Sequence, residues 1–219
     1  MSGSRSQGQH AGLDTRAILR AAINLADREG LAALSMRRLG AELGVEAMAL
    51  YHHIPNKDAL LDGMVEELAA ATPIPKLDTK NWQDGLRAYT RSQLDSLASH
   101  PNLVTLILSR PAVTERNLQM MEMLLESLGK AGFPPGRALD IVYALNALIL
   151  VHAALGAGVG DAPAPHGEKG QDSRLADLSA ETYPLLTRAA RQSRNRKPTA
   201  RFEFTLDALL VGFADATRA

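Results

Sequence analysis

Apolar residues recur at helical spacing through almost all of this 219-residue sequence, and this periodicity is the feature that most constrains the fold. In the first periodic segment, Ile18 is followed by Ala22, Leu25 and Ala26, which places all four on one face of a helix. No stretch shows a convincing repeat, a heptad pattern or the alternation of a strand. The chain is therefore expected to be all-α.

Prolines, glycines and capping residues divide this pattern into separate helices. Ser35 and Asn56 are candidate N-caps, and Gly30 and Gly44 are candidate helix ends. The expected helices cover residues 14–30, 36–43, 45–54, 57–71, 80–99, 102–109, 114–132, 135–156, 172–192 and 199–217. Pro184 is expected to kink or split the helix that contains it.

The remaining segments are expected to be loops or tails. Residues 1–12 are rich in Ser, Gly and Gln and have no apolar core, which predicts a disordered tail rather than a signal peptide. Residues 156–170, rich in Gly, Ala and Pro, are expected to form a mobile loop, and residues 191–197 form a basic patch. The prolines within residues 72–75 are expected to end the N-terminal group of helices.

The composition excludes several classes of protein. The chain has no cysteine, which excludes disulfide scaffolds, cysteine nucleophiles and cysteine-bound zinc, and suits a reducing compartment. The most apolar stretch, residues 141–155, contains Asn146 and His152 and is shorter than the roughly 20 residues of a membrane span. We therefore expect a cytoplasmic protein with no membrane contact.

The charge balance does not indicate a nucleic-acid-binding protein. Lys and Arg number 24, as do Asp and Glu, so the formal net charge is zero. Residues 14–72 hold six basic and nine acidic side chains. A DNA-binding function would therefore depend on where the charges lie rather than on how many there are.

Residues 35–54 have the pattern of a helix-turn-helix, two short helices joined by a turn that contains Gly44. In this arrangement Val45, Leu50 and Ile54 pack inward, and the outward side chains are those of Ala47, Met48, Tyr51 and His52. Small apolar groups gain little from facing water but can contact thymine methyl groups in the major groove.

Polar side chains around this pattern are candidates for DNA contacts. Arg37 suits a bidentate contact with guanine, Tyr51 and His53 can donate to phosphates, and Ser35 begins a helix whose free N–H groups suit a phosphate. Each also has an ordinary structural explanation. Ser35 can be a cap alone, Arg37 and Arg38 a solvated pair, and the two histidines surface or core residues.

The sequence of residues 34–61 resembles the TetR family of bacterial repressors, through Leu-Ser-Met-Arg-Arg-Leu-Gly-Ala-Glu-Leu-Gly-Val and Leu-Tyr-His-His-Ile-Pro-Asn-Lys-Asp-Ala-Leu-Leu. The resemblance implies a two-fold dimer whose recognition helices enter major grooves ~34–36 Å apart. With Ser35 and Arg38 added to the positions implied by the family, the predicted DNA-binding set is Ser35, Arg37, Arg38, Ala47, Met48, Ala49, Tyr51, His52, His53 and Lys57.

This resemblance predicts two domains after the tail, a DNA-binding domain at residues 13–72 and a ligand-binding and dimerisation domain at residues 73–219. In the second domain, residues 81–87 and 109–111 resemble the tetracycline-repressor branch, which holds a magnesium–tetracycline chelate partly through histidine. Leu106 and Thr72-Pro73 stand where that branch has histidine, and leucine offers no lone pair to a metal. We therefore expect neither tetracycline nor any metal or cofactor.

Methionine and leucine residues predict a soft apolar cavity for a small hydrophobic effector, with a few polar side chains to orient it. The alternative is a plain hydrophobic core. The predicted ligand-binding set is Met64, Leu68, Tyr89, Gln93, Leu106, Ser109, Met120, Met121, Leu124, Asn146 and His152.

Two apolar helix faces near the end of the chain exceed what one small body needs to bury, which predicts a four-helix dimer interface. The predicted interface residues are Leu139, Val142, Ile149, Ala153, Phe202, Leu206, Leu209, Leu210 and Phe213.

The sequence features bear on three classes of function. The predicted function is a DNA-binding repressor that a small hydrophobic effector releases from its operator. An enzyme is not expected, because the sequence has no His-Glu-x-x-His run and no glycine-rich phosphate loop. A ligand-sequestering or scaffold protein stays open as the alternative because of the zero net charge.

Overall fold

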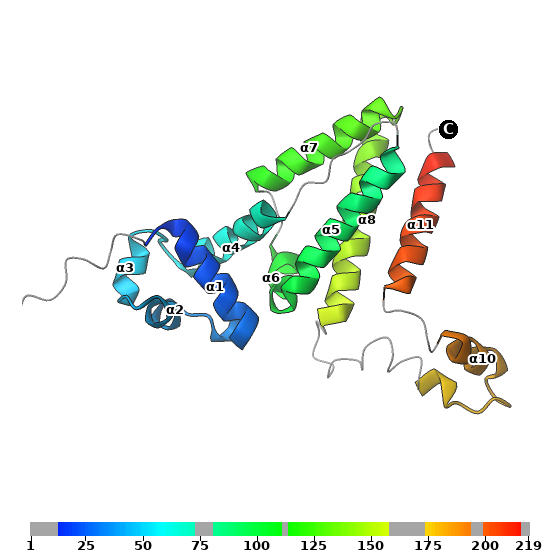
Figure 1. The fold of residues 1–219 in the computed structure, drawn as a ribbon, viewed down its shortest axis with the longest axis horizontal. Coiled ribbons are helices and arrows are strands. Elements are labelled where there is room, and N and C mark those ends of the chain that lie inside the picture. The colour runs from blue at the N-terminus through cyan, green and yellow to red at the C-terminus, as the bar shows by residue number, and fades with distance from the viewer. Residues whose placement is uncertain (1–12, 73–80, 111–113, 158–173, 194–198, 216–219) are drawn as a thin grey trace, which may run out of the picture. The chain divides into compact units, whose positions relative to one another are not determined.

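The computed structural model describes residues 13–72, 81–110, 114–157, 174–193 and 199–215, and these contain helices and turns but no strand (Figure 1). The all-α prediction is confirmed. The chain divides into two compact units. We call residues 1–73 with 105–118 the N-terminal unit, and residues 74–104 with 119–219 the C-terminal unit.

The N-terminal unit begins with four helices whose starts follow the capping residues. They are α1 (Thr15–Glu29), α2 (Met36–Leu43), α3 (Ala47–Tyr51) and α4 (Lys57–Ala71), with a 3-10 turn at Leu31–Ala33. The side chains of Asp14, Ser35 and Asn56 accept backbone N–H bonds at the starts of α1, α2 and α4. Helix α3 is shorter than the predicted 45–54, because Glu46 is extended and the chain turns after Tyr51.

Helices α1 and α4 pack closely and are also joined by charge. A Cβ atom at Gly63 would lie 2.7 Å from Leu19 Cδ2, so a larger residue there would require the Leu19 side chain to shift. On the same pair of helices, Glu67 accepts hydrogen bonds from Arg16 Nε at 3.0 Å and Arg20 Nε at 2.8 Å. The core of this unit includes fully buried side chains of all four helices: Ile18, Leu25, Leu39, Leu50, Leu60 and Met64.

A second chain segment, residues 105–118, also belongs to the N-terminal unit. The sequence analysis predicted that all residues from 73 to 219 belong to the second domain. The segment contains most of α6 (Val104–Ser109). Arg110, directly after α6, forms ion pairs with Asp58, at 2.9 Å, and with Asp62, both on α4. These ion pairs join residues that are far apart in the sequence, so helical periodicity could not predict them.

The C-terminal unit is built on long helices. Its described elements are α5 (Trp82–Ser99), a 3-10 turn (Pro101–Leu103), most of α7 (Glu115–Lys130), α8 (Pro135–Ala157), α10 (Pro184–Ser193) and α11 (Ala200–Asp215). Turns occupy residues 177–182, and α10 begins at Pro184, so the prediction that this proline splits the helix is confirmed. The predicted loop at 156–170 lies largely outside the described residues, as does the tail at 1–12.

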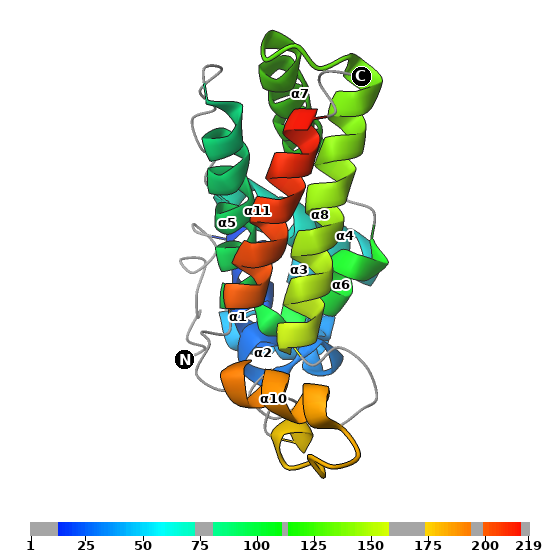
Figure 2. The ribbon, with the colours of Figure 1, turned by 90° about the vertical axis from the view of Figure 1, so that its right-hand side faces the viewer.

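The core of the C-terminal unit lies among α5, α7, α8 and α11, with α8 packed against both α5 and α11 (Figure 2). The rings of Trp82 and Phe133 meet edge to face at a centroid distance of 5.0 Å. The buried core residues are Leu86, Tyr89, Met120, Leu124, Leu128, Phe133, Ala138, Ile141, Val142, Leu145, Ile149, Phe202, Leu206 and Leu210.

Helix α8 alone among the described helices is long and apolar enough to cross a bilayer, with a mean hydropathy of 1.9 over its most apolar window. The helix agrees with the predicted range 135–156, but its apolar character extends beyond residues 141–155, the stretch that the sequence analysis judged too short for a membrane span. One face of α8 belongs to the core just described, as expected of an apolar helix in a folded body. Only 33% of its most apolar window is buried, so much of its apolar surface is exposed.

Candidate nucleic-acid interface

Two glycines shape the turn between α2 and α3. A Cβ atom at Gly40 would lie 2.8 Å from the carbonyl oxygen of Val45, and Val45 N–H donates to the Gly40 carbonyl at 2.9 Å. Gly44 has a φ of +69°, the left-handed conformation in which glycine is unstrained. The sequence predicted Gly44 as the turn residue, and the close contact at Gly40 is a finding of the structure.

Helix α3 presents an exposed apolar surface. Leu50 and Ile54 are buried as predicted, whereas Val45 is only half-buried. On the outward side, Met48 is 67% exposed and Tyr51 is 42% exposed. Ala47 and Ala49 are half-buried, and His52 and His53 are exposed at the end of the helix.

The arginines of this unit differ in their partners. Of the six basic side chains in residues 13–72, the four arginines at positions 16, 20, 28 and 38 pair with carboxylates. The other two, Arg37 and Lys57, are exposed and have no carboxylate partner among the described residues. These two side chains flank α3 in the sequence.

Arg38 belongs to a carboxylate network. Its guanidinium lies 2.5 Å from Glu29 Oε1 and 3.4 Å from Glu42 Oε2. Arg28 pairs with Glu42 at 2.7 Å. The hydrogen bond from Arg38 holds the pKa of Glu29 below its usual value. Sequence reasoning placed Arg37 and Arg38 in the DNA-binding set together, but the structure gives only Arg37 an unpaired head group.

Ser35 has a structural role whatever else it contacts. Its hydroxyl oxygen accepts the Arg38 backbone N–H at 3.1 Å, which caps α2.

The predicted effector residues fall into both units. Met64, Leu68, Leu106 and Ser109 lie in the N-terminal unit, where the Ser109 hydroxyl donates to the carbonyl of Leu106 in its own helix. The other predicted residues lie in the C-terminal unit. There Tyr89, Met120 and Leu124 are buried in the core, and the half-buried ones are Gln93, Met121, Asn146 and His152.

The structure joins two of the predicted polar effector residues. The Tyr89 hydroxyl donates to Asn146 Oδ1 at 2.7 Å, between α5 and α8. Burial raises the pKa of Tyr89 to about 12, so its hydroxyl stays protonated as a hydrogen-bond donor. His152 lies against the ring of Phe202 at a centroid distance of 4.9 Å. The C-terminal core thus contains a polar pair among apolar side chains.

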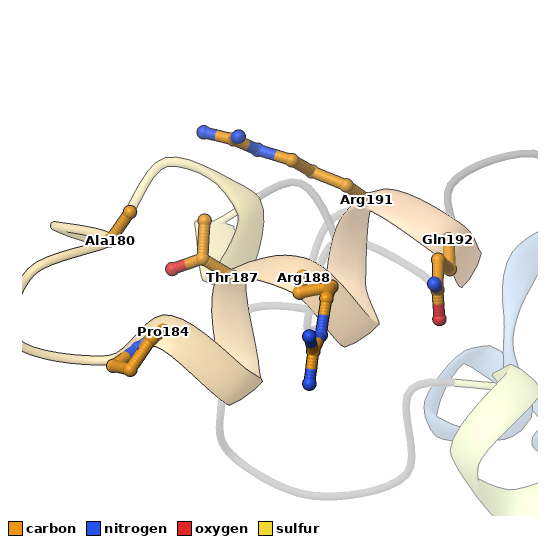
Figure 3. Close-up of a pocket in the computed structure, with 6 residues that line it drawn as sticks. All are labelled: Ala180, Pro184, Thr187, Arg188, Arg191 and Gln192. Carbon is orange, nitrogen blue, oxygen red and sulfur yellow. The ribbon is translucent and has the colours of Figure 1, made fainter.

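A shallow open pocket of about 450 Å³ lies on α10 and the turn before it, and none of its residues is in the predicted ligand-binding set: Ala180, Pro184, Thr187, Arg188, Arg191 and Gln192 (Figure 3). The side chains of Arg188 and Arg191 point in different directions from the helix, so they do not converge on one ligand (Figure 3). Within the described part of the chain, no group of three or more His, Asp or Glu side chains could hold a metal ion.

The predicted dimer-interface residues are mostly buried within the chain. Six of the nine residues are buried inside the chain itself and have little surface for a partner: Val142, Ile149, Ala153, Phe202, Leu206 and Leu210. The other three, Leu139, Leu209 and Phe213, are half-buried. Helices α8 and α11 are apolar on more than one side, so periodicity alone did not show which residues pack inside the chain.

The opposite faces of these helices are exposed and apolar. On α8 the exposed side chains are Tyr143, Val151 and Leu155, and on α11 they are Phe204 and Val211, each at least 58% exposed. We call these five residues the apolar stripe. Helices α8 and α11 pack against each other, and large exposed apolar surfaces are typical of sites of protein contact.

The N-terminal unit therefore carries a helix-turn-helix whose second helix is exposed, and a larger helical body follows it. These features define the class of helix-turn-helix DNA-binding regulators. A family model described as "Bacterial regulatory proteins, tetR family" matches residues 18–64. A second model, "Tetracyclin repressor-like, C-terminal domain", matches residues 74–216. The chain belongs to the TetR family.

Individual relatives agree with this assignment. The tetracycline repressor protein class A from transposon 1721 of Escherichia coli is 31% identical over 206 residues, which are 92% of this chain and 91% of the relative. The HTH-type transcriptional repressor DrrR1 of Streptomyces coeruleorubidus is 31% identical over 146 residues, and the match spans 66% of this chain but only 54% of DrrR1.

A solved structure has the same fold over nearly the whole chain. ActR of Streptomyces coelicolor, in complex with actinorhodin, superimposes with a TM-score of 0.79 at 25% identity, covering 94% of this chain and 99% of ActR.

Proposed function

We propose that this protein is a transcriptional repressor that binds a two-fold operator as a homodimer and leaves it when a small hydrophobic effector binds. The observation that carries the proposal is the exposed, uncharged α3, flanked in the sequence by the two unpaired cations Arg37 and Lys57. The major groove admits a single helix, and an apolar helix surface suits its floor better than it suits water.

The side chains around α3 are proposed to have different roles in DNA recognition, some contacting bases and others contacting phosphates. Arg37 has a free guanidinium that can form two hydrogen bonds with guanine. Tyr51 and Lys57 are exposed donors for backbone phosphates, which position a protein without reading sequence. Arg38 instead positions α2 through Glu29 and Glu42, and we remove it from the set of DNA contacts.

The apolar stripe supports a homodimer. A second copy related by a two-fold axis would cover Tyr143, Val151 and Leu155 of α8 together with Phe204 and Val211 of α11. Four helices, two from each copy, would then form the interface. The two α3 helices would meet successive major grooves ~34–36 Å apart.

The effector is proposed to be a small, mainly apolar molecule bound in the C-terminal unit. Tyr89 and Asn146 form a polar pair inside an apolar core, which suits a ligand with one or a few oriented polar groups. Leu106 is buried and apolar, and the Thr72 hydroxyl donates to the Leu68 carbonyl. Neither side chain is a good metal ligand, which supports an effector held without a metal at these positions.

Helix α4 is the proposed element through which the effector acts. Arg110 holds α4 through Asp58 and Asp62, and the segment that carries Arg110 continues into α7. A ligand changes DNA affinity only through its different affinities for the two conformations of the protein. We propose that one of these conformations displaces α4 and with it the spacing of the two α3 helices.

We place the DNA-binding function in the cytoplasm. A salt titration of DNA affinity tests this function. The purified chain is used to select duplexes from a random-sequence pool, and the affinity for the selected duplex is measured by fluorescence anisotropy at rising salt. Arg37 and Lys57, the two cations without a carboxylate partner among described residues 13–72, would together contribute a slope of about −4 in log affinity against log salt for the dimer at pH 8. A folded dimer that enriches no sequence would contradict the proposal and favour a ligand-sequestering protein, the alternative that the zero net charge supports.

Thermal-shift screening tests the effector. Compounds that raise the melting temperature of the protein should also release the selected duplex, because binding to one state of the protein stabilises that state. Stabilising compounds that leave DNA affinity unchanged would contradict effector control.

A further inference from the structure

Helix α3 lacks the side chains that usually distinguish purines in the major groove. Its five residues are Ala47, Met48, Ala49, Leu50 and Tyr51, and none has an amide, a carboxylate or a guanidinium group. Bidentate hydrogen bonds to guanine or adenine come from Arg, Lys, Asn or Gln. Helix α3 therefore has to distinguish bases in another way if it lies in the groove.

Met48 has the reach for that role. It lies near the middle of α3, it is 67% exposed, and the alanines on either side of it are half-buried. The side chain is unbranched and polarizable, so it can adapt to a methyl group on a facing surface. Of the four bases, only thymine presents an apolar group, its C5 methyl, in the major groove.

We infer that Met48 is a specificity-determining residue that selects thymine in the operator half-site by contact with the C5 methyl group. This inference rests on the proposed DNA-binding function and adds to it the base that α3 reads. The polar side chains nearest to α3 in the sequence, Glu46 and His52, lie just outside its two ends. The half-site then contains a thymine under Met48 and a guanine that Arg37 contacts from α2.

Methyl removal in the DNA tests the inference. A duplex is first selected from a random pool, and each of its thymines is then replaced in turn by uracil, which keeps base pairing and lacks only the methyl. Loss of one buried methyl contact is expected to weaken binding about fourfold, which is ~0.8 kcal/mol. In each half-site, at least one thymine should show this loss with the wild-type chain.

The protein variants identify the side chain that senses the methyl. Met48→Ala should bind the thymine and uracil duplexes equally, and Met48→Leu should keep a preference for thymine. Tyr51→Phe is the matched control, which should weaken both duplexes together and keep their ratio. Because Met48 is exposed, Met48→Ala should melt at the same temperature as the wild-type chain.

A second change in the DNA separates the methyl group from the rest of the base. At the sensitive position, 5-methylcytosine paired with guanine restores the methyl while changing the hydrogen-bonding pattern. It should bind more tightly than unmethylated cytosine there, and only when Met48 is present.

The outcomes separate the two claims. If no duplex is enriched, the proposed function fails. If a duplex is enriched but no thymine is sensitive to uracil, or if Met48→Ala keeps the sensitivity, the methyl-reading role is overturned while the proposed function stands.

Discussion

Both units of the molecule expose large apolar side chains, but in different settings. On the N-terminal unit, Met48 and Tyr51 form a small patch on one five-residue helix, beside two exposed histidines. On the C-terminal unit, the apolar stripe runs along two long helices that pack against each other. The small patch next to polar donors suits a groove in DNA, whereas the long stripe suits the matching surface of a second protein chain.

Charged substitutions in the apolar stripe are expected to have the largest effect. The double change Phe204→Asp and Val211→Asp places two carboxylates where the proposed partner packs, so the dimer should dissociate. Operator affinity should then fall more than 100-fold, because two linked half-site contacts become one. Sedimentation velocity and anisotropy measure the two effects.

Thr205→Asp is the matched control for this experiment. Thr205 is exposed on the same helix but outside the stripe, so this variant should remain dimeric. A dimer that survives the double substitution would show that the apolar stripe is not the interface. The assignment of the α3 patch to DNA and of the stripe to a second protein chain would then lose its second half.

The adjacent arginines of α2 provide a sharper test within the N-terminal unit. Arg37→Ala should lower operator affinity about 10- to 100-fold, which matches the ~1–3 kcal/mol of a bidentate base contact. Arg38→Ala should instead lower the melting temperature, because it removes the ion pairs to Glu29 and Glu42, and should change the operator affinity of the folded protein much less. Equal losses of affinity in both variants would contradict the separate roles.

The smallest expected effect concerns Tyr89 in the C-terminal core. Folding raises its pKa to about 12, so its hydroxyl keeps its proton in a pH range where an unfolded tyrosine loses it. The resulting stability is present below pH ~10 and is lost as the pH rises toward the folded value. In an absorbance titration of the phenolates, Tyr89→Phe should remove a late-ionising step. A titration curve that keeps this step would place the raised pKa elsewhere.

Local signals in the sequence were enough to predict most of the helices. Ser35 and Asn56 cap α2 and α4, Gly44 ends α2, and Pro184 begins α10. Each of these signals acts within a few residues of the chain. The end of α3 was harder, since the chain leaves the helix after Tyr51 although nothing nearer than Pro55 marks a stop.

Contacts between distant residues could not be predicted in the same way. Arg37 and Arg38 are chemically identical neighbours, and they differ only because Glu29 and Glu42 lie near one of them in the fold. Tyr89 and Asn146 were both predicted as effector residues, but their mutual hydrogen bond spans 57 residues. In α8 and α11, apolar residues occur on opposite faces, so periodicity identified the helices without showing which face turns inward.

The carboxylates that neutralise four arginines of the N-terminal unit have a consequence for how the protein would search a chromosome. Random DNA attracts proteins mainly through cations that displace its counterions, and a repressor with few such cations adheres weakly to the vast excess of irrelevant sequence. Fewer repressor molecules are then bound to nonspecific DNA, so a small number of repressor molecules per cell would suffice to occupy the operator.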